Sequence, residues 1–143
     1  MGMSQAVKTV YSKYASFSGR ASRSEFWWFY LFYVVVVLVL NFVDSILGWQ
    51  YGSSSFDVTM NDTVNHYTVG GVGILATIFG LLTLLPMLGV MARRLHDSGH
   101  SGLWIIWGYL LSIACCIGFV ILIVFWCQKS EPGDTKYGPQ PAA

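Results

Sequence analysis

Six charged side chains at the ends of two apolar runs are the strongest candidate for chemistry in this sequence: Arg20, Arg23, Glu25, Arg93, Arg94 and Asp97. The planar guanidinium of arginine can bind two oxygens of a phosphate at once. The pattern therefore predicts a site for an anion or a lipid headgroup. In this interpretation the four arginines bind, and Glu25, Asp97 and His96 support them.

A second interpretation of the same residues is topological. Lysine and arginine collect at the cytoplasmic ends of membrane helices, and positive charge beside lipid phosphates requires no further ligand. The carboxylates would then fix the packing of the helices. Arg93 and Asp97 are four residues apart and would pair if a helix runs through both. The sequence leaves both interpretations open.

Histidines and serines near the second basic site carry weaker patterns. His96 and His100 have the spacing of two metal ligands on a helix, but the surrounding glycines and serines indicate a loop, and no third ligand is apparent. Ser98 or Ser101 beside His96 and Asp97 has the composition of a hydrolytic triad, but neighbours in sequence rarely reach triad geometry. We therefore expect no metal, no cofactor and no catalytic residue.

The composition indicates that a membrane protein positions these residues. Of 143 residues, 55% are hydrophobic and only 10% are charged, whereas about a quarter of a typical soluble domain is charged. A soluble core of this length could not bury so much apolar surface. The net charge of +1 provides no global basic field, so we expect no nucleic-acid partner.

Three long apolar segments predict an all-α, polytopic membrane protein. The predicted transmembrane helices cover residues 23–47, 71–92 and 103–127. The first begins at a capping box, with Ser22 as the N-cap and Glu25 at the third helical position. The third segment is long enough for one tilted span at about 1.5 Å per residue. Two half-helices broken near Gly118 are the alternative, but each would be too short to cross alone.

The remaining segments are more polar. Residues 4–17 predict a short amphipathic helix, which lies on the membrane surface or packs on the protein's own helices. Residues 48–69 form a loop without lysine or arginine, in which alternating residues indicate a small β-hairpin. Residues 93–102 predict another loop, and residues 128–143, rich in glycine and proline, predict a flexible tail.

The distribution of lysine and arginine predicts the orientation of the chain. Basic residues precede the first span and follow the second, so the N-terminus and residues 93–102 are expected in the cytoplasm and residues 48–69 outside. Three spans would place the tail outside, although it carries Lys129 and Lys136. A re-entrant third segment would place it inside. We expect three spans.

Two rows of small residues, spaced by three or four, predict close helix packing: Gly73, Ala76, Gly80 and Thr83, and then Gly108, Ser112 and Cys116. Small side chains let helix backbones approach closely in a membrane. We expect these faces to support a homo-oligomer or a membrane protein partner.

Asn41 and Asp44 lie near the end of the first span. Polar groups at membrane depth often mark an ion path, but such a path would need an oligomer, and we expect helix capping or packing instead. A non-enzymatic protein that binds membrane lipid or a partner is therefore the expected function. A small oligomeric transporter or channel is the alternative.

Both basic sites resemble a known family. The segments GRASRSEFW (residues 19–27) and RRLHDSGHSGLW (residues 93–104), with the closing Tyr137-Gly138-Pro139, resemble the DUF805 family. Residues 47–50 and 70–75 resemble its YhaH type. The chain departs from the family pattern at Leu103 and at His100. It also departs at Ala114-Cys115, where the family often has a proline. The last departure favours a continuous third helix. The resemblance implies a small bacterial inner-membrane protein, and it implies no activity.

Overall fold

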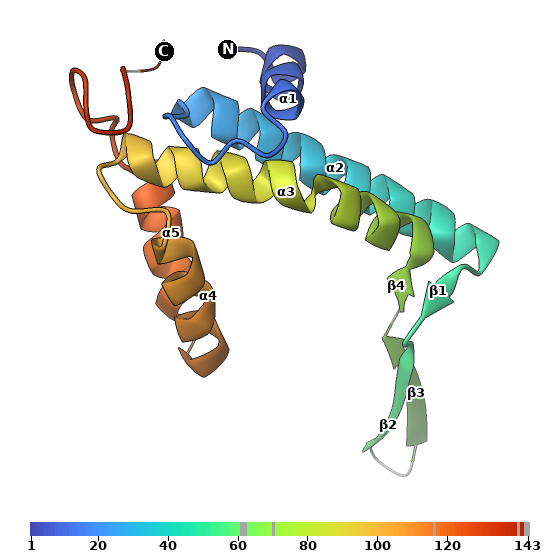
Figure 1. Ribbon diagram of the computed structural model, residues 1–143. Helices are drawn as coiled ribbons and strands as arrows, with labels where there is room; N and C mark the ends of the chain where they lie inside the picture. The colour runs from blue at the N-terminus through green and yellow to red at the C-terminus, as the bar shows by residue number, and fades with distance from the viewer. Residues whose placement is uncertain (61–62, 70, 116, 140, 142–143) are drawn as a thin grey trace. The chain divides into compact units, whose positions relative to one another are not determined.

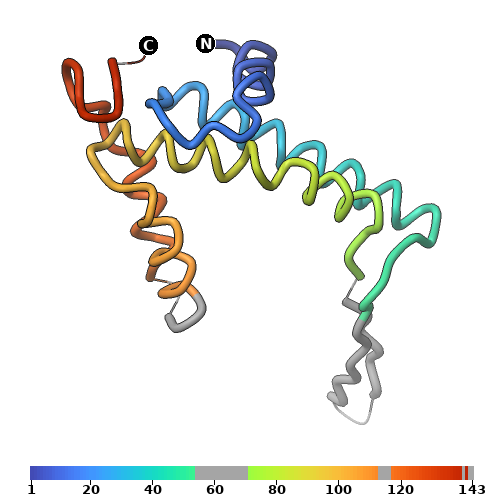
Figure 2. The backbone as a smooth tube through the Cα atoms, in the orientation of Figure 1, coloured from blue at the N-terminus to red at the C-terminus, as the bar shows by residue number. Residues whose placement is uncertain are grey.

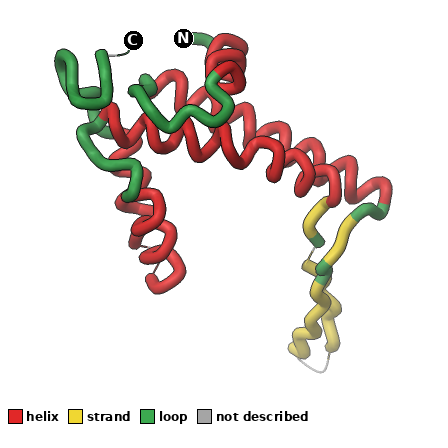
Figure 3. The backbone as a smooth tube through the Cα atoms, in the orientation of Figure 1, coloured by secondary structure: helices red, strands yellow, loops and turns green. Residues whose placement is uncertain are grey.

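The computed structural model describes residues 1–60, 63–69, 71–115, 117–139 and 141, and it is mainly helical (Figure 1). The helices are α1 (Met3–Ser12), α2 (Arg23–Leu47), α3 (Ile74–Asp97), α4 (Trp104–Cys115) and α5 (Ile117–Cys127). The strands, yellow in Figure 3, are β1 (Gln50–Tyr51), β2 (Ser54–Met60), β3 (Thr63–Val69) and β4 (Val72–Gly73). The predicted helical character is confirmed, although the three predicted spans are not, and among the described residues the strands lie in one stretch between α2 and α3.

The chain folds as two compact units. Unit 1 comprises Met1–Phe32 and Leu84–Ala143, and unit 2 comprises Tyr33–Thr83. The helices α2 and α3 each contribute to both units. Among the described residues, these two helices are long and apolar enough to cross a bilayer, with 25 and 24 residues. Each is about 36 Å long at a rise of 1.5 Å per residue, which exceeds the hydrocarbon thickness of a bilayer.

The start of α2 follows from the capping box, of which one half is present. Ser22 Oγ accepts a hydrogen bond from the backbone N–H of Glu25 at 3.2 Å, which satisfies one of the free donors at the helix end. The Glu25 carboxylate accepts a hydrogen bond from Arg93 at 2.8 Å. The side chain expected to complete the cap therefore joins α2 to α3 in unit 1.

The first helix is shorter than the expected 4–17, because α1 ends at Ser12. The N–H of Lys13 closes the last turn on Thr9 and Val10 carbonyls. Ala6 and Val10 are fully buried, and the ring of Tyr11 contacts Phe29 of α2 edge-on, with centroids 5.8 Å apart. Of the two predicted locations for this helix, the structure has the one packed on the protein's own helices.

The second long helix continues past its expected end at residue 92 and includes half of the expected loop 93–102. The helix ends at Asp97 because the next residues form a Schellman motif, in which the N–H of His100 donates to Leu95 O at 2.9 Å and that of Gly99 to His96 O at 3.2 Å. Gly99 has φ of 77°, the left-handed conformation that this motif requires. Both arginines and Asp97 are therefore helical residues.

The third apolar segment differs most from its prediction. Instead of one helix over 103–127, it forms α4 and α5, which pack side by side (Figure 1). The two helices are antiparallel, since Gly108 faces Leu122 and Gly118 faces Ser112. A Cβ added at Gly118 would overlap the carbonyl oxygen of Gly108, so only glycine permits this approach.

The small residues of this segment therefore face its own hairpin. Ser112 Oγ donates to Gly108 O at 2.7 Å, and Cys116 lies outside the described residues. The departure at Ala114-Cys115, interpreted as favouring a continuous helix, did not predict the division of the segment. The glycines at positions 108 and 118 allow the two shorter helices to pack closely.

The tail after α5 is irregular, as its composition predicts, and hydrogen bonds join it to the rest of unit 1. The N–H of Glu131 donates to Asp97 O at 2.9 Å, and Thr135 and Gly138 form an isolated bridge. The N-terminal and C-terminal segments of unit 1 lie near each other (Figure 2). Met1, Lys13, Tyr137 and Pro139 line one cleft between them.

In unit 2 the hairpin indicated by the alternating residues is present. Strands β2 and β3 pair antiparallel from Ser54 opposite Val69 to Met60 opposite Thr63, and β1 pairs with β4 at their base. The row Gly73, Ala76, Gly80 and Thr83 of unit 2 lies towards α2. A Cβ at Gly80 would lie 3.6 Å from the Tyr33 hydroxyl, and Phe79 stacks on Tyr33 with centroids 5.9 Å apart.

Candidate functional site

Asp97 is the centre of the basic cluster in unit 1, and its side chain is completely buried. Its Oδ1 accepts a hydrogen bond from Arg20 Nε at 2.9 Å, and its Oδ2 accepts from Arg94 Nη1 and from Ser130 Oγ. A buried charge is tolerated when it is paired and hydrogen-bonded. Two arginines that are 74 residues apart in sequence therefore share one carboxylate.

Arg20 and Arg94 also bind the end of the chain. Their remaining guanidinium nitrogens donate to four backbone carbonyls: those of Trp126, Gln128, Glu131 and Gly133. Every guanidinium nitrogen of these two side chains has a partner within the protein. Arg20 and Arg94 are buried and fully hydrogen-bonded, so they hold the tail in place. Both share Asp97 as their anion.

Arg93 takes a different partner from the one its spacing predicts. It does not pair with Asp97; its Nη1 donates to Glu25 Oε1 at 2.8 Å, and its side chain is 1% exposed. Among the described residues, its Nε and Nη2 have no hydrogen-bond partner. Buried donors without a partner cost about 1–3 kcal/mol each, so water or an anion normally satisfies them.

Arg23 is the most accessible of the four arginines. It is half-buried, and its Nε donates to Gln128 O at 2.8 Å. The side chain lines a hollow of about 290 Å³ together with four other residues of α2: Ser24, Trp27, Trp28 and Leu31. The structure thus separates the predicted site residues into an internal group of three arginines and one arginine at the surface.

The charges of the chain are divided between the two units. All eight lysines and arginines belong to unit 1, together with four carboxylates, whereas unit 2 has three aspartates and no lysine or arginine. The net charges are therefore +4 for unit 1 and −3 for unit 2, which add to the chain's +1. The confinement of lysine and arginine to one part of the chain, rather than net charge, is the pattern that orients membrane proteins.

The two histidines of the predicted loop face different partners. The ring of His96 stacks on Tyr137 with centroids 4.0 Å apart, and its Nδ1 lies 3.3 Å from Gly19 O. The ring of His100 stacks on Phe125 at 3.9 Å. His96 therefore supports the segment before α2 and the tail rather than an arginine. Within the described part of the chain, no three histidine, cysteine or acidic side chains are grouped for a metal.

The serines of this region bond to nearby backbone atoms. Ser98 Oγ donates to Leu95 O at 3.1 Å, and Ser101 Oγ accepts from the N–H of Leu103 at 3.4 Å. Hydroxyls that bond in this way terminate helices or start them. Among the hydrogen bonds of the described residues, the hydroxyls of Ser98 and Ser101 bond to backbone atoms and not to His96 or Asp97.

In unit 2, Asp44 of α2 caps the beginning of α3. Its buried carboxylate accepts the backbone N–H groups of Leu75 at 3.2 Å and Ala76 at 3.1 Å. Asn41 Oδ1 accepts the N–H of Gly73 at 3.3 Å. These are the donors that a helix leaves unsatisfied at its N-terminus. The contacts support the capping interpretation of both residues.

The tail residues that complete the cluster were not predicted from the sequence. Gln128, Glu131 and Gly133 contribute backbone carbonyls, for which side-chain patterns carry no signal. Ser130 contributes a hydroxyl, but serine is common in irregular tails. The available signal was the pair Lys129 and Lys136, which favours the cytoplasmic side for the tail.

Comparison with known proteins finds one family. The family model described as "Protein of unknown function (DUF805)" matches residues 14–139. Inner membrane protein YhaH of Escherichia coli K12 is 39% identical over 132 residues, which are 92% of this chain and 92% of YhaH. Inner membrane protein YhaI of the same strain is 32% identical over 133 residues, 93% of this chain and 92% of YhaI. No solved structure matches the chain.

Proposed function

The chain belongs to the DUF805 family and is an integral inner-membrane protein, and we propose that it binds anionic lipid headgroups through Arg23 without catalysing a reaction. The observation that carries this proposal is the hollow at the start of α2, where Arg23 lies beside two exposed tryptophans. The other three cluster arginines are almost fully buried, so Arg23 is the guanidinium that a lipid can reach.

The hollow has the order of chemical groups that a phospholipid needs. Arg23 can bind two phosphate oxygens, and the hydroxyl of Ser24 can donate to another. Trp27 and Trp28 are 38% and 41% exposed, and tryptophan favours the headgroup region of a bilayer. Leu31 follows one turn further and offers apolar surface to the first carbons of an acyl chain.

The internal arginines contribute in a different way. The pairs of Arg20 and Arg94 with Asp97 hold the tail against α3, and the tail positions Gln128, whose carbonyl orients Arg23. The net charge of +4 on unit 1 adds an attraction to anionic headgroups that does not depend on one contact. Direct headgroup contact by Arg20, Arg93 or Arg94 is not part of this proposal.

Lipid retention during purification tests the proposal. The wild-type protein, Arg23→Gln and Lys8→Gln are purified in mild detergent from the same cells, and retained phospholipid is quantified by mass spectrometry. Lys8 is an exposed basic residue of α1, so its variant removes the same charge elsewhere on unit 1. We expect Arg23→Gln to retain several-fold less phosphatidylglycerol and cardiolipin, and Lys8→Gln to resemble the wild type.

Two outcomes would contradict the proposal. Equal retention of phospholipid by all three proteins would exclude a specific role of Arg23. An equal loss in both variants would show that retention depends on net charge alone. Thermal unfolding of each variant distinguishes loss of lipid from loss of fold, because Arg23 donates to the backbone carbonyl of Gln128 and its neutral replacement leaves the Asp97 pairs intact. Arg94→Gln is unsuitable here, since it breaks a buried pair.

The alternative, a small transporter or channel, depended on Asn41 and Asp44. Both side chains bond to backbone N–H groups at the start of α3, so we do not propose it. Self-association stays a prediction. The small residues expected to support it face neighbouring parts of the same chain, as Gly80 and Gly108 do.

A further inference from the structure

We propose that α4 and α5 form a re-entrant hairpin, which enters the hydrocarbon of one leaflet and returns without crossing the bilayer. The lengths of the helices are the first argument. With 12 and 11 residues they extend about 18 and 17 Å, whereas the hydrocarbon core is about 30 Å thick. The hairpin therefore reaches about as far as the midplane of the bilayer. Its outer surface contacts the acyl chains of a single leaflet.

The contacts at the base of the hairpin are the second argument. The residue after α5, Gln128, bonds through its carbonyl to Arg23 at the start of α2. The N–H of Glu131 bonds to the carbonyl of Asp97 at the end of α3. A single crossing helix over residues 103–127 would move Gln128 about 36 Å from Leu103. The observed bonds require both ends of the hairpin on the side where α2 begins and α3 ends.

The surface of the hairpin is the third argument. No charged residue occurs between Trp104 and Cys127. Large apolar side chains are exposed on both helices, including Ile106 at 64%, Leu110 at 56% and Val120 at 59%. A helix that lies flat on a membrane has one polar face, and this hairpin has none. Its uniformly apolar surface fits immersion in hydrocarbon.

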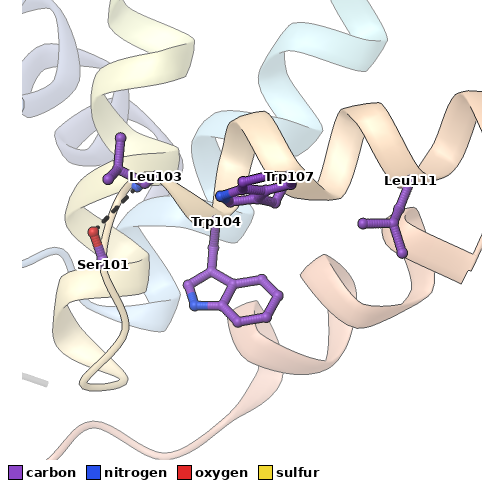
Figure 4. A pocket seen from close by; sticks show the side chains of 5 residues that line it. All are labelled: Ser101, Leu103, Trp104, Trp107 and Leu111. Carbon is purple, nitrogen blue, oxygen red and sulfur yellow. Dashed lines mark hydrogen bonds between the residues drawn. The ribbon is translucent and has the colours of Figure 1, made fainter.

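The base of α4 carries the residues expected at the membrane interface. Trp104 and Trp107 line an apolar hollow of about 390 Å³ with Ser101, Leu103 and Leu111 (Figure 4). The hollow runs from the serine, where the loop ends, to Leu111 near the far end of the helix. Tryptophan prefers the headgroup level, so this order places Ser101 at the interface and Leu111 within the leaflet.

Accessibility of single cysteines tests the topology. In a variant whose three native cysteines are replaced by alanine, one cysteine is introduced at an exposed position: Lys8→Cys, Ser53→Cys or Asp134→Cys. Intact and permeabilised spheroplasts are labelled with a membrane-impermeant maleimide. We expect positions 8 and 134 to give the same labelling pattern and position 53 the opposite one. The proposal is overturned if position 134 follows position 53, as three complete spans require.

Two further measurements test the same topology, and the first of them needs no cysteine variant. Sealed right-side-out and inverted vesicles of the wild-type protein are treated with trypsin. Cleavage at Lys129 or Lys136 must occur from the same face as cleavage at Lys8 or Lys13, and cleavage from opposite faces would contradict the hairpin. Spin labels at Ile106 and Leu110 then measure depth by oxygen accessibility. We expect Leu110 to be deeper; equal depths would indicate a hairpin lying flat.

Discussion

Asp97 and Asp44 are both completely buried, yet the two units balance their charges differently. In unit 1, Asp97 lies at the C-terminal end of α3 and pairs with Arg20 and Arg94. In unit 2, Asp44 is a residue of α2 that contacts the N-terminal end of α3. It accepts the backbone N–H groups of Leu75 and Ala76. The charge of Asp97 is therefore balanced by two arginine side chains, and that of Asp44 by backbone N–H groups at the start of α3.

The dipole of α3 contributes to this difference, although Asp44 itself lies in the last turn of α2, whose C-terminus opposes its charge. The N-terminus of a helix carries about half a positive charge, so it stabilises Asp44 without any lysine or arginine. The C-terminus carries the opposite partial charge and destabilises a carboxylate there. Asp97 is buried at that unfavourable end, and two arginines compensate both the desolvation and the dipole. The separation of charge between the units thus has a local structural reason.

Removal of the Asp97 carboxylate should have the largest effect on stability. Asp97→Ala leaves Arg20 and Arg94 buried without an anion, which should cost about 3–5 kcal/mol. Thermal unfolding in detergent, followed by tryptophan fluorescence, measures the loss, and trypsin cleavage at Lys129 reports release of the tail. An unchanged melting temperature would contradict the view that the two buried arginines depend on this carboxylate.

Removal of the Asp44 carboxylate should have a smaller effect. Asp44→Ala deprives two backbone N–H groups at the start of α3 of their acceptor, and loss of an N-cap typically costs about 1–2 kcal/mol. The same unfolding measurement applies. A loss as large as that in Asp97→Ala would contradict the view that the helix, and not a paired cation, balances Asp44.

Asn41→Leu tests the neighbouring acceptor in unit 2. The substitution keeps the approximate volume but removes the oxygen that accepts the N–H of Gly73, which should cost about 1 kcal/mol. Double-mutant analysis with Asp44→Ala would then measure whether the two residues act as one cap. Strict additivity would indicate independent contributions.

Ser130→Ala should have the smallest effect of these variants. It removes one donor to Asp97 but leaves both arginines in place, so we expect a loss of about 0.5–1 kcal/mol. Because Ser130 belongs to the tail, cleavage at Lys129 should increase slightly. A destabilisation comparable to that of Asp97→Ala would mean that the hydroxyl, rather than the arginines, holds the carboxylate.

Local signals in the sequence predicted much of the framework. The Ser22 capping box placed the start of α2 at Arg23, and the alternating residues indicated the hairpin of β2 and β3. The end of α3 was placed at residue 92 because two arginines follow, although Gly99 is the actual signal for its termination. A glycine after helix-compatible residues was therefore more informative than the change from apolar to charged residues.

Contacts that are distant in sequence could not be predicted in the same way. The partners of Arg20 lie 77 to 113 residues away, and most are backbone carbonyls. Whether an arginine faces lipid or the protein interior depends on these partners and not on its neighbours in the chain. The division of the third apolar segment likewise depends on the contact between Gly108 and Gly118, which neither hydropathy nor length reveals.

The most direct test of the account is to replace each buried aspartate by asparagine. Asparagine keeps only one of the two oxygens with which Asp44 accepts the N–H groups of Leu75 and Ala76, so the free energy of unfolding of Asp44→Asn should fall by about 1 kcal/mol. Asp97→Asn should lose about 3 kcal/mol, because it leaves two buried arginines facing a neutral amide. Equal losses in the two variants, or a larger loss in Asp44→Asn, would contradict the claim that the two ends of α3 balance their aspartates by different means.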